Sequence, residues 1–439
     1  MSEKKRFHIV TYGCQMNVHE SEKIAGMLSE LGYTNCDEME SADVVVFNTC
    51  CIRENAENHA FGNIGMLKKL KADKKDMIIA VGGCLTQQMG KAENLHDKFP
   101  YVDVIFGTHN LHKLKDYILL KRTQKKAVIN IEDDDGSIFE GDNPLRTSYP
   151  NAWVNITYGC NNFCSYCIVP YVRGRERSRK AQNIIAEVEE LVKQGYKEIT
   201  LLGQNVNSYG NGTDEPSFPE LLERIANIEG KFRLRFMTSH PKDFSEELAK
   251  VIARNSKICH CVHLPVQSGS NEILKAMNRK YTAEDYLEKI EILKKYVPDC
   301  TVTTDLIVGF PNETEEDFEA TLNLVKKVGY SSAFTFVYSK RDGTVAAKMP
   351  NQIPEDISKR RIMKLVELVN SLTREQSASY VGKAVEILCE DYDKKKGMYC
   401  GRDEYGRMCY FESENNAIGE FVNLKITKAN GISLYGERI

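Results

Sequence analysis

Three cysteines near the middle of the chain have a spacing that suits metal chemistry. Cys160, Cys164 and Cys167 form a C-x3-C-x2-C group, and thiolates are the usual ligands of iron–sulfur clusters. A four-iron cluster normally takes four thiolates, so a compact trio leaves one iron open to a substrate or cofactor. A structural zinc site is the alternative, but such a site closes with four ligands. The spacing therefore favours a four-iron cluster with one open iron.

A second cysteine trio is spread along the first part of the chain. Cys14, Cys50 and Cys84 each follow an apolar run that is typical of a β-strand. The carboxyl ends of parallel strands meet at one edge of a sheet, where ligands bind in open α/β folds. Buried cysteines can also be ordinary small hydrophobic residues. Cys51 adjoins Cys50, and of these two Cys50 is the preferred ligand. The three cysteines at strand ends predict a second metal site.

These cysteines require a parallel sheet to position them. Strand-like runs separated by amphipathic stretches predict a parallel α/β domain over residues 1–145. The stretch from Glu20 to Leu31 has helical spacing and ends before Gly32, which suits a left-handed cap. A linker is expected at about residues 125–150. The strand-like runs are residues 7–11, 44–47, 78–81 and 102–106.

From residue 153 the alternation of strand and helix starts again. Six strand–helix units predict an incomplete (β/α)6 barrel over residues 146–378, closed by a long amphipathic stretch at 354–379. After Gly382 the periodicity changes to short strands, which predicts a small C-terminal β-barrel over residues 379–439. The expected barrel strands are 154–157, 199–202, 234–238, 259–266, 302–308 and 333–338. The expected C-terminal strands are 385–389, 408–411, 421–426 and 432–435.

The C-x3-C-x2-C group, with Tyr166 before its last cysteine, resembles the signature of the radical S-adenosylmethionine superfamily. In that family the open iron chelates the cofactor, and an electron from the cluster cleaves it to a 5'-deoxyadenosyl radical. An N-terminal three-cysteine domain, a radical domain and a C-terminal β-domain together resemble the methylthiotransferases over nearly the whole chain. Residues 12–17, 48–50 and 106–110 are similar to the branch that acts on isopentenyladenosine in tRNA.

This resemblance implies methylthiolation of C2 of N6-isopentenyladenosine at position 37 of tRNA, next to the anticodon. The implied cofactors are two four-iron clusters and S-adenosylmethionine, which serves as methyl donor and as radical source. An electron donor and a sulfur source, both unidentified, are implied partners. The alternatives are methylthiolation of N6-threonylcarbamoyladenosine or of a ribosomal-protein aspartate. From another class, a non-enzymatic iron–sulfur protein that binds RNA and carries electrons would also have two trios.

The resemblance also implies a cofactor site at the carboxyl ends of the barrel strands. Gln204 or Asn205 stands where related enzymes have a Gly-Gly-Glu-like motif for the amino group of the cofactor. Ser239, Gln267 and Ser268 follow later strands on the same face, and Tyr166 lies in the cluster loop. Polar loops at strand ends are the alternative interpretation. Hydrogen-atom abstraction by a radical needs no general base, so His240 and His263 receive no catalytic role.

Arginines in two segments are candidates for RNA contacts. Arg173, Arg175 and Arg177 alternate after the cluster loop and would share one face of an extended chain, as a phosphate clamp does. A solvated charged loop is the alternative. Arg402 and Arg407 alternate with aromatic residues in the last segment, which resembles a TRAM-like RNA-binding β-barrel. There the aromatic residues would stack on bases, although a barrel core needs such residues as well.

Composition limits the other possibilities. The chain has 439 residues, 42% of them hydrophobic, and a net charge of −3, so RNA binding must come from local basic patches. Its 14 cysteines suit metal binding better than disulfides if the protein is in the cytoplasm. No run approaches the roughly 18 apolar residues of a membrane span. The sequence therefore predicts a cytoplasmic protein without a membrane anchor.

Overall fold

The computed structural model describes residues 4–51, 54–133, 138–140 and 143–439. The chain divides into two compact units. The N-terminal unit comprises residues 1–147 together with 158–161 and 168–177, and the barrel unit comprises residues 148–157, 162–167 and 178–439. The two short segments of the N-terminal unit come from the region expected to belong to the barrel, which the sequence pattern did not predict.

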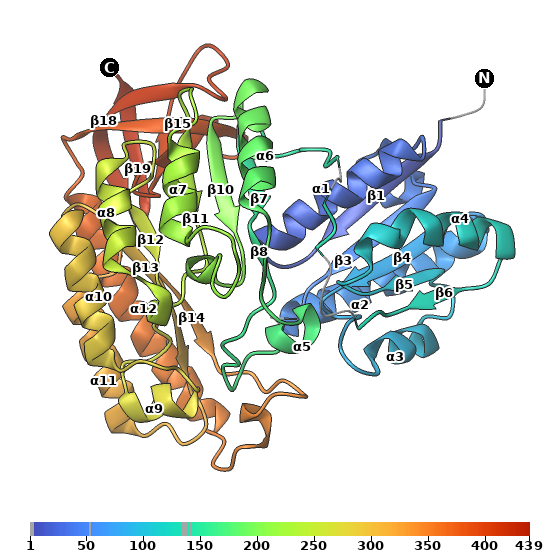
Figure 1. Cartoon of the computed structure of the whole chain (residues 1–439), viewed down its shortest axis with the longest axis horizontal. Helices are drawn as coiled ribbons and strands as arrows, with labels where there is room; N and C mark the ends of the chain where they lie inside the picture. Colours follow the sequence, from blue (N-terminus) through green and yellow to red (C-terminus); the bar gives the residue numbers. More distant parts are fainter. Residues whose placement is uncertain (1–3, 52–53, 134–137, 141–142) are drawn as a thin grey trace. The chain divides into compact units, whose positions relative to one another are not determined.

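The N-terminal unit is built around six parallel strands in the order β2-β1-β3-β4-β5-β6 (Figure 1). The strands are β1 (Arg6–Thr11), β2 (Thr34–Asn35), β3 (Val44–Thr49), β4 (Ile78–Gly83), β5 (Val104–Phe106) and β6 (Val128–Asn130). The helices are α1 (Gln15–Glu30), η1 (Met39–Ser41), α2 (Glu54–Asp73), α3 (Lys91–Lys98), η2 (Leu111–Lys113), α4 (Leu114–Gln124) and α5 (Val169–Arg173).

Helices cover both faces of this sheet. Along β3, Val44 and Val46 pack with residues of α1 and α4, whereas Val45 and Phe47 pack with residues of α2 and α3. Successive strand side chains point to opposite faces, so a strand buried on both faces is apolar throughout. The predicted parallel α/β domain is confirmed. The sequence missed β2 and β6 because each is short and neither is buried, and β6 lies inside the predicted linker.

The barrel unit contains six parallel strands in two sheets, β11-β10-β7 and β12-β13-β14, bridged where Leu234 meets Ile258. This arrangement confirms the predicted incomplete (β/α)6 barrel. The strands are β7 (Asn151–Asn155), β10 (Glu198–Leu202), β11 (Arg233–Phe236), β12 (Cys261–His263), β13 (Thr301–Val308) and β14 (Ser332–Val337). Two short strands, β8 (Thr157–Tyr158) and β9 (Arg177–Ser178), flank the cluster loop in the sequence.

Helices line the outer side of these strands (Figure 1). Capping boxes start two of them: Thr282 with Asp285 begins α10, and Thr314 with Asp317 begins α11. The helices are α6 (Ala181–Lys193), η3 (Val206–Ser208), α7 (Phe218–Ala226), η4 (Pro241–Asp243), α8 (Glu246–Arg254), α9 (Asn271–Ala276), α10 (Ala283–Tyr296), α11 (Glu315–Val328), η5 (Ala346–Lys348) and α12 (Glu355–Ala378).

The last strands close into a small barrel in the order β15-β16-β17-β19-β18, as predicted. They are β15 (Ala384–Asp393), β16 (Met398–Asp403), β17 (Met408–Phe411), β18 (Phe421–Asn430) and β19 (Ser433–Arg438). Arg233 of β11 donates to the carbonyl oxygens of Glu386 and Arg402, both at 2.7 Å. These bonds attach the small barrel to the larger one, and both belong to the barrel unit.

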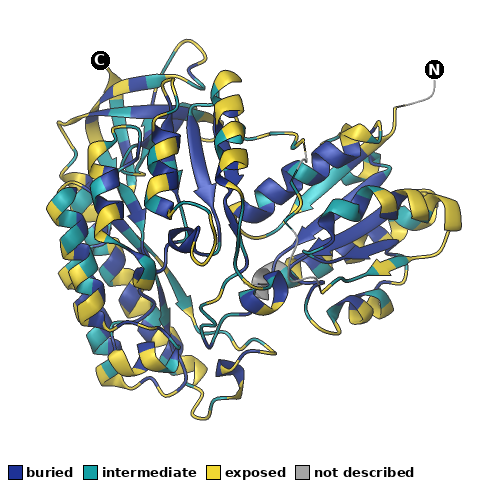
Figure 2. Ribbon diagram, in the orientation of Figure 1, coloured by how far each residue is buried: buried dark blue, intermediate teal, exposed yellow. Residues whose placement is uncertain are grey.

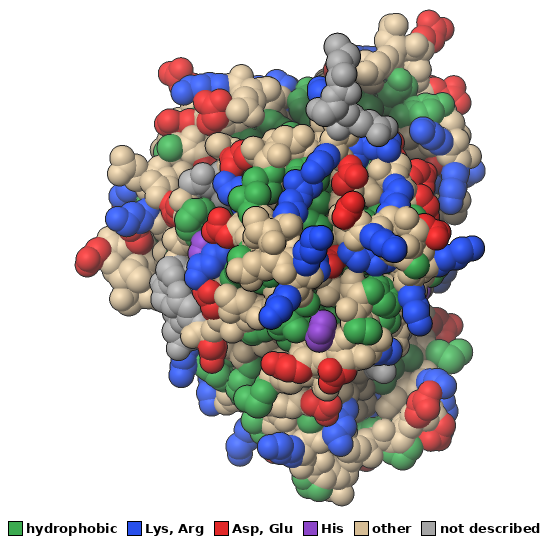
Figure 3. Space-filling model, turned by 90° about the vertical axis from the view of Figure 1, so that its right-hand side faces the viewer, with side chains coloured by type: hydrophobic (Ala, Val, Ile, Leu, Met, Phe, Trp, Pro, Cys, Tyr) green, Lys and Arg blue, Asp and Glu red, His purple; other side chains and the backbone are tan. Residues whose placement is uncertain are grey.

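Burial follows this architecture. The central strands are buried, while the helices expose their outer faces (Figure 2). Lys and Arg side chains are interspersed with Asp and Glu on the face seen in Figure 3, in keeping with the small net charge of −3. In the part of the chain that the structure describes, no helix combines the length and the apolar character that crossing a membrane requires.

Candidate functional site

The first cysteine trio lies at one edge of the N-terminal sheet. Cys14, Cys50 and Cys84 follow β1, β3 and β4, which are neighbours in the sheet. Thr49 pairs with Gly83, so Cys50 and Cys84 leave their strands at the same level. Cys50 and Cys84 are buried, whereas Cys14 is exposed. The structure thus brings the three thiols to the edge that the sequence predicted, and their role as ligands stays a prediction.

Two glycines hold the backbone close to these thiols. Gly13 has φ 112°, and a Cβ on it would lie 2.7 Å from Cβ and 2.8 Å from Sγ of Cys50. Gly83 has φ 106°, and a Cβ there would lie 2.9 Å from Asn48 Oδ1. Only glycine adopts these conformations without strain. Glycine therefore lets the segments before Cys14 and Cys84 approach Cys50 and the end of β3 closely.

A buried arginine lies among the same groups. Arg173 ends α5 and is 6% exposed. Its Nη1 and Nη2 donate to the two carboxylate oxygens of Glu20 at 2.5 and 3.1 Å, and Nη2 donates to Asn17 Oδ1 at 3.1 Å. Burial opposes its charge, but the neighbouring Cys84 and Glu20 raise its pKa well above the usual value. Arg173 therefore departs from the expected phosphate clamp, because its guanidinium is engaged inside the protein.

The thiols at this edge differ in acidity. A hydrogen bond from Cys51 and the nearby Arg173 charge lower the pKa of Cys84 to about 7, although burial acts in the opposite direction. The pKa of Cys51 is raised by the same hydrogen bond and by burial. Iron is bound by the thiolate form, which a lowered pKa favours. Cys84 thus fits a ligand, and Cys51 acts here as a hydrogen-bond donor.

The trio suits an iron–sulfur cluster. Within the described residues, no group of three or more His, Cys, Asp or Glu side chains is arranged to hold one metal ion. In an iron–sulfur cluster each thiolate binds its own iron, so the sulfurs surround the cluster and not one ion. Thiols at a common edge, a cation beside them and glycine-rich approaches all suit such a group.

The three cysteines of the second trio are divided between the two units. Cys160 belongs to the N-terminal unit, where its N–H donates to the carbonyl oxygen of Gly174 at 3.2 Å. Cys164 and Cys167 belong to the barrel unit, where the N–H of Cys167 donates to the Cys164 carbonyl oxygen at 2.9 Å. Phe163, just before this turn, has φ 44°. The inference of a shared cluster therefore continues to rest on the C-x3-C-x2-C spacing.

Sequence reasoning missed a second buried arginine, Arg279, because it lies 115 residues from the cysteine that it contacts. Its Nη1 donates to Cys164 Sγ at 3.4 Å, and its Nη2 donates to the Pro265 carbonyl oxygen at 2.7 Å. Its Nε donates to the Tyr281 hydroxyl at 2.7 Å. Such a donor fixes a ligand sulfur and stabilises its thiolate.

Two of the predicted cofactor contacts form hydrogen bonds within the fold, and their contact with the cofactor stays a prediction. Asn205 Nδ2 donates to Asp243 Oδ2 at 2.7 Å, while Asn205 Oδ1 accepts from the His240 N–H at 3.1 Å. Both ends of its amide thus fix the turn after β11, which leaves the half-buried Gln204 as the candidate of that pair. Asn205 was predicted from its position in a motif, and that position does not reveal these long-range bonds.

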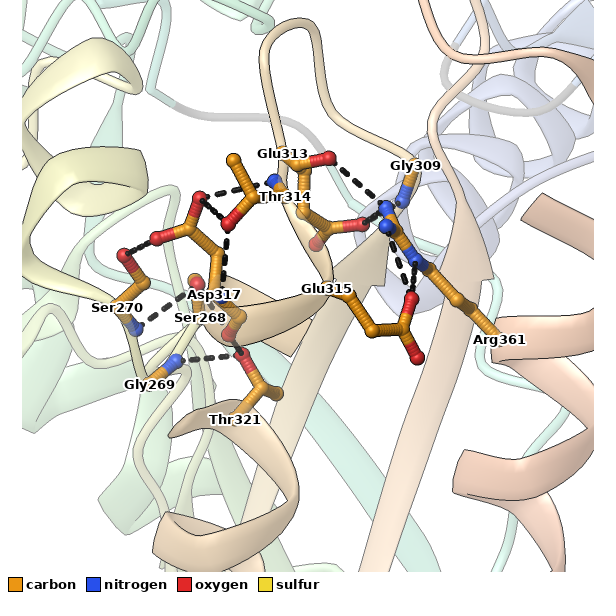
Figure 4. Close-up of polar contacts among 10 residues, drawn as sticks. All are labelled: Ser268, Gly269, Ser270, Gly309, Glu313, Thr314, Glu315, Asp317, Thr321 and Arg361. Atoms are coloured by element: carbon orange, nitrogen blue, oxygen red, sulfur yellow. Dashed lines mark hydrogen bonds and ion pairs between the residues drawn. The ribbon is translucent and has the colours of Figure 1, made fainter. Parts of the chain in front are cut away.

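Ser268 is the second predicted cofactor contact that forms hydrogen bonds within the fold. It is fully buried, with its hydroxyl 3.3 Å from Thr321 Oγ1 and accepting from the Ser270 N–H at 3.2 Å (Figure 4). Ser270 in turn bonds to Asp317 at the start of α11. Ser268 therefore ties its loop to α11. Gln267 is buried with φ 72°, and its contact with the cofactor stays a prediction.

Figure 4 also shows how α12 is attached to the turn after β13. Glu313 Oε2 accepts from the Gly309 N–H at 2.7 Å and from Arg361 Nη1 at 2.8 Å. Arg361 is 6% exposed and also bonds to Glu315. Burial raises the pKa of Glu313 above its usual value despite these bonds. Arg361 is thus a buried, ion-paired arginine that belongs to the fold.

Tyr166 packs against an apolar cluster of the barrel unit. Its neighbours there are Ile273, Met277, Phe310 and Ala346. Burial raises the pKa of its hydroxyl well above the usual value. The ring helps to fix the cluster loop, and its contact with the cofactor stays a prediction.

Buried polar atoms gather at the ends of three neighbouring barrel strands. In the described ranges, protein hydrogen-bond partners are lacking for Thr157 Oγ1 after β7, both amide atoms of Asn207 after β10, and Ser239 Oγ and His240 Nε2 after β11. All four residues are at most 7% exposed. Buried polar groups without partners are rare and indicate a missing ligand or water. The residues present therefore fit S-adenosylmethionine, and only Ser239 was predicted.

The other arginines near the cluster loop are not on one face. Arg175 is exposed, while Arg177 is half-buried and its Nη2 donates to the Arg173 carbonyl oxygen at 2.9 Å. The physical reason is that helix α5 ends at Arg173 and Gly174 follows with φ 72°, so Arg173 and the two later arginines are not on one extended segment. A phosphate contact stays a prediction for Arg175 and Arg177.

The two arginines of the small barrel are engaged by their own domain. Arg402 forms a two-pronged pair with Glu390, with Nη2–Oε2 at 2.8 Å and Nε–Oε1 at 3.1 Å. Arg407 lies over the Tyr380 ring, 3.8 Å from its centroid, and near Asp403. Both guanidinium groups are thus engaged within the small barrel, and their contacts with RNA stay predictions.

A pocket opens beside Arg173 in the N-terminal unit. Tyr158, Arg177 and the stacked rings of His112 and Phe139, whose centroids are 4.8 Å apart, also line it. The remaining lining residues are Glu20, Lys23, Thr108, His109, Leu111 and Ile138. Aromatic rings next to cations suit a nucleotide, because the base stacks while the phosphate meets the charges. No sequence motif had predicted this pocket.

Comparison with known families agrees with this arrangement. Residues 154–325 match the radical SAM superfamily, and residues 378–439 match the TRAM domain. Residues 6–107 match the family described as "Uncharacterized protein family UPF0004". The matched ranges include all six cysteines of the two trios and the small barrel.

Curated relatives match over nearly the full length. The chain is 52% identical over 435 residues to tRNA-2-methylthio-N(6)-dimethylallyladenosine synthase of Clostridium botulinum strain Langeland, covering 99% of this chain and 97% of the relative. It is 50% identical over 438 residues to the enzyme of that name from Caldicellulosiruptor saccharolyticus, covering 100% and 93%.

Solved structures show a similar fold at low identity. The radical S-adenosylmethionine methyltransferase TsrM from Kitasatospora setae, with cobalamin and a [4Fe-4S] cluster bound, has a TM-score of 0.58 at 16% identity and covers 78% of this chain and 74% of its own. The cobalamin-dependent S-adenosylmethionine radical enzyme OxsB has a TM-score of 0.52 at 13% identity, covering 84% and 56%.

Proposed function

The chain belongs to the family of tRNA-2-methylthio-N(6)-dimethylallyladenosine synthases, and we propose that it methylthiolates C2 of N6-isopentenyladenosine at position 37 of tRNA. It is a radical SAM methylthiotransferase. S-adenosylmethionine serves both as methyl donor and as radical source, and the chain uses two four-iron clusters.

The observation that carries this proposal is the first trio, with three cysteines after three neighbouring strands. One radical cluster would serve any member of the superfamily, whereas inserting sulfur needs a second group that delivers it. When bound, one cluster would supply the electron that cleaves S-adenosylmethionine, and the other would supply the sulfur. The residues Cys14, Cys50 and Cys84 hold one cluster, and Cys160, Cys164 and Cys167 hold the other.

The remaining residues of the site bind and orient. Arg279 fixes Cys164 through the hydrogen bond to its sulfur. Ser239 and Asn207 supply buried polar atoms that lack partners among the described residues, so they meet the polar groups of S-adenosylmethionine. Proton transfer is not required of any of them, because a radical removes hydrogen from the base.

The pocket beside Arg173 is the candidate site for the modified nucleotide. Tyr158 and the stacked pair of His112 and Phe139 offer ring faces to a base, and Arg177 offers a charge to its phosphate.

The protein acts in the cytoplasm, where tRNA, an electron donor and a sulfur source are all present.

Nucleoside analysis of tRNA tests the substrate. A strain without the gene should lack 2-methylthio-N6-isopentenyladenosine and accumulate the unmodified isopentenyl nucleoside. A plasmid copy should restore it, and a copy with Cys14→Ala should not. Retention of the methylthio nucleoside in the deletion strain would refute the proposed substrate.

A second experiment separates the enzyme from a non-enzymatic electron carrier. The reconstituted, reduced protein is incubated with S-adenosylmethionine, and 5'-deoxyadenosine is measured. We expect 5'-deoxyadenosine from the parent protein and from Cys14→Ala, which keeps the second trio, but not from Cys164→Ala. Absence of the product from the parent protein would favour the carrier.

A further inference from the structure

Arg173 is unusual because of the segment that supplies it. Only residues 168–172 separate it from Cys167 of the second trio. Nevertheless, the segment packs in the N-terminal unit, where Ile168 and Val172 form a buried cluster with Cys51 and Cys84. The chain that carries the second trio thus continues into the edge that carries the first.

The polar contacts of Arg173 converge on the first trio. Asn17, which accepts from Arg173, donates to the carbonyl oxygens of Tyr12 at 2.8 Å and Thr49 at 3.1 Å. These two carbonyls lie on the chain segments that lead into Cys14 and Cys50. The Arg173 guanidinium is therefore linked, through Asn17, to the segments that lead into Cys14 and Cys50.

Arg173 also lies beside the thiols of the first trio. Its Nη2 shares the acceptor Asn17 Oδ1 with Cys14 Sγ, which is 3.9 Å from that oxygen, and the preceding residue, Val172, packs with Cys84. A guanidinium has five N–H donors in a fixed plane. The Glu20 carboxylate and Asn17 accept three of the bonds, so donors remain for sulfur.

Stability alone does not account for the buried ion pair of Arg173 with Glu20. A buried ion pair is often no more stable than apolar residues of the same size, since burying two charges is costly. Hydrogen bonds and positive charge near cluster sulfurs, by contrast, change the reduction potential and the retention of a cluster. The geometry favours this second purpose.

We propose that Arg173 is a positioning residue for the N-terminal cluster, in which its guanidinium holds the sulfurs of Cys84 and Cys14 and Glu20 holds the guanidinium. This inference rests on the proposed function, because it requires a cluster at the first trio. It adds that a residue just after the radical signature supports the other cluster.

The competing explanation is that Arg173 only neutralises Glu20. The double variant Glu20→Gln/Arg173→Gln decides between the two, because it removes both charges and leaves no buried charge unpaired. If neutralisation is the whole role, the double variant should behave like the parent. If Arg173 acts on the sulfurs, the double variant should behave like Arg173→Gln.

The test uses the full chain with Cys164→Ala as parent, since Cys164 lies in the barrel unit and its loss leaves the first trio intact. Each variant is reconstituted with iron and sulfide. Retention of iron against a chelator and the midpoint potential of the remaining cluster, followed by electron paramagnetic resonance, are then measured. Neither measurement needs tRNA or catalytic turnover.

Arg173→Gln should retain the cluster about 10- to 100-fold more weakly, the usual effect of losing a group that supports a ligand. Its midpoint potential should fall, because a cation and its hydrogen bonds favour the reduced cluster. Arg173→Lys should lie between the parent and Arg173→Gln, since Lys keeps the charge without the planar fork. It also keeps the test valid if Arg173→Gln folds poorly.

Arg361→Gln is the matched control. Arg361 is also 6% exposed and paired with a buried glutamate, but it lies in the barrel unit at the Glu313 turn. We expect it to leave retention and potential at the first trio unchanged. An equal effect of Arg361→Gln would indicate general destabilisation and overturn the inference.

The remaining outcomes are equally decisive. Unchanged retention and potential in Arg173→Gln, or parental behaviour of the double variant, would overturn the inference and leave the proposed function standing. A parent that holds no cluster after Cys164→Ala would overturn the first-trio cluster, and with it both proposals.

Discussion

Gly82 lies where an added methyl group should disturb the edge that carries the first trio. It is in β4, two residues before Cys84, and a Cβ on it would come within 3.0 Å of three ring carbons of Phe106. The Phe106 ring is fully buried in the core between the sheet and its helices. Gly82→Ala therefore forces either the ring or the strand to move.

Overpacking of this kind costs about 1–3 kcal/mol. At roughly 1.4 kcal/mol per factor of ten, local opening should become about 5- to 150-fold more frequent. Hydrogen exchange followed by mass spectrometry measures this directly in peptides that cover β3, β4 and β5. Iron retention at the first trio should fall in parallel, because Cys84 is the second residue after the substitution.

A second substitution tests the stated cause. Phe106→Leu removes the ring, so Gly82→Ala/Phe106→Leu should exchange more slowly than the sum of the single effects predicts. Gly62→Ala in α2 is the control, since a Cβ there has no heavy atom within 4 Å. Its exchange should be unchanged or slower. Unaltered exchange in Gly82→Ala, or additive effects in the double variant, would refute the reasoning.

Three further predictions concern individual side chains. Cys50→Ala should lose about four irons and Cys51→Ala none, as measured by iron analysis; equal losses would contradict the assignment of Cys50. Arg175→Ala should lower the salt dependence of tRNA binding by about one phosphate contact, as measured by filter binding. Arg407→Ala should leave this salt dependence unchanged and lower the stability of the small barrel, as measured by thermal unfolding. The reverse pattern would contradict both expectations. Burial and nearby cations hold the pKa of His240 at about 2. In the unfolded chain the pKa is near 6.5, so protonation below that pH stabilises only the unfolded chain. The free energy of unfolding should therefore fall by about 2 kcal/mol from pH 7 to 5, and by less in His240→Gln.

Much of the fold follows from local patterns. The apolar runs at 44–47 and 78–81 had to be strands buried on both faces, because every residue in them is apolar. The long amphipathic stretch became α12 with nearly the expected ends, Glu355–Ala378. Strands β2 and β6 escaped prediction since they have two and three residues and carry little apolar pattern. Position at a strand end sufficed to bring Cys14, Cys50 and Cys84 to one edge.

Roles that depend on a distant partner could not be predicted. Arg173 was expected at the surface because an Arg in a charged segment usually faces water, yet Glu20 lies 153 residues away and receives it in the interior. Arg279 had no motif at all, although it contacts Cys164. Asn205 matched a motif position, and its amide forms long-range bonds to the turn after β11 that the motif does not reveal.

The sequence by itself determined the two cysteine trios, the order of the domains and the class of chemistry, because spacing along the chain and strand periodicity are local properties. Only the tertiary structure decided which polar groups remain available to a ligand. A hydrogen bond or ion pair forms between groups that folding brings together, and burial then makes it costly to leave either group unpaired. That is why the cysteines were found from the chain, whereas the arginines that support them were found only in the fold.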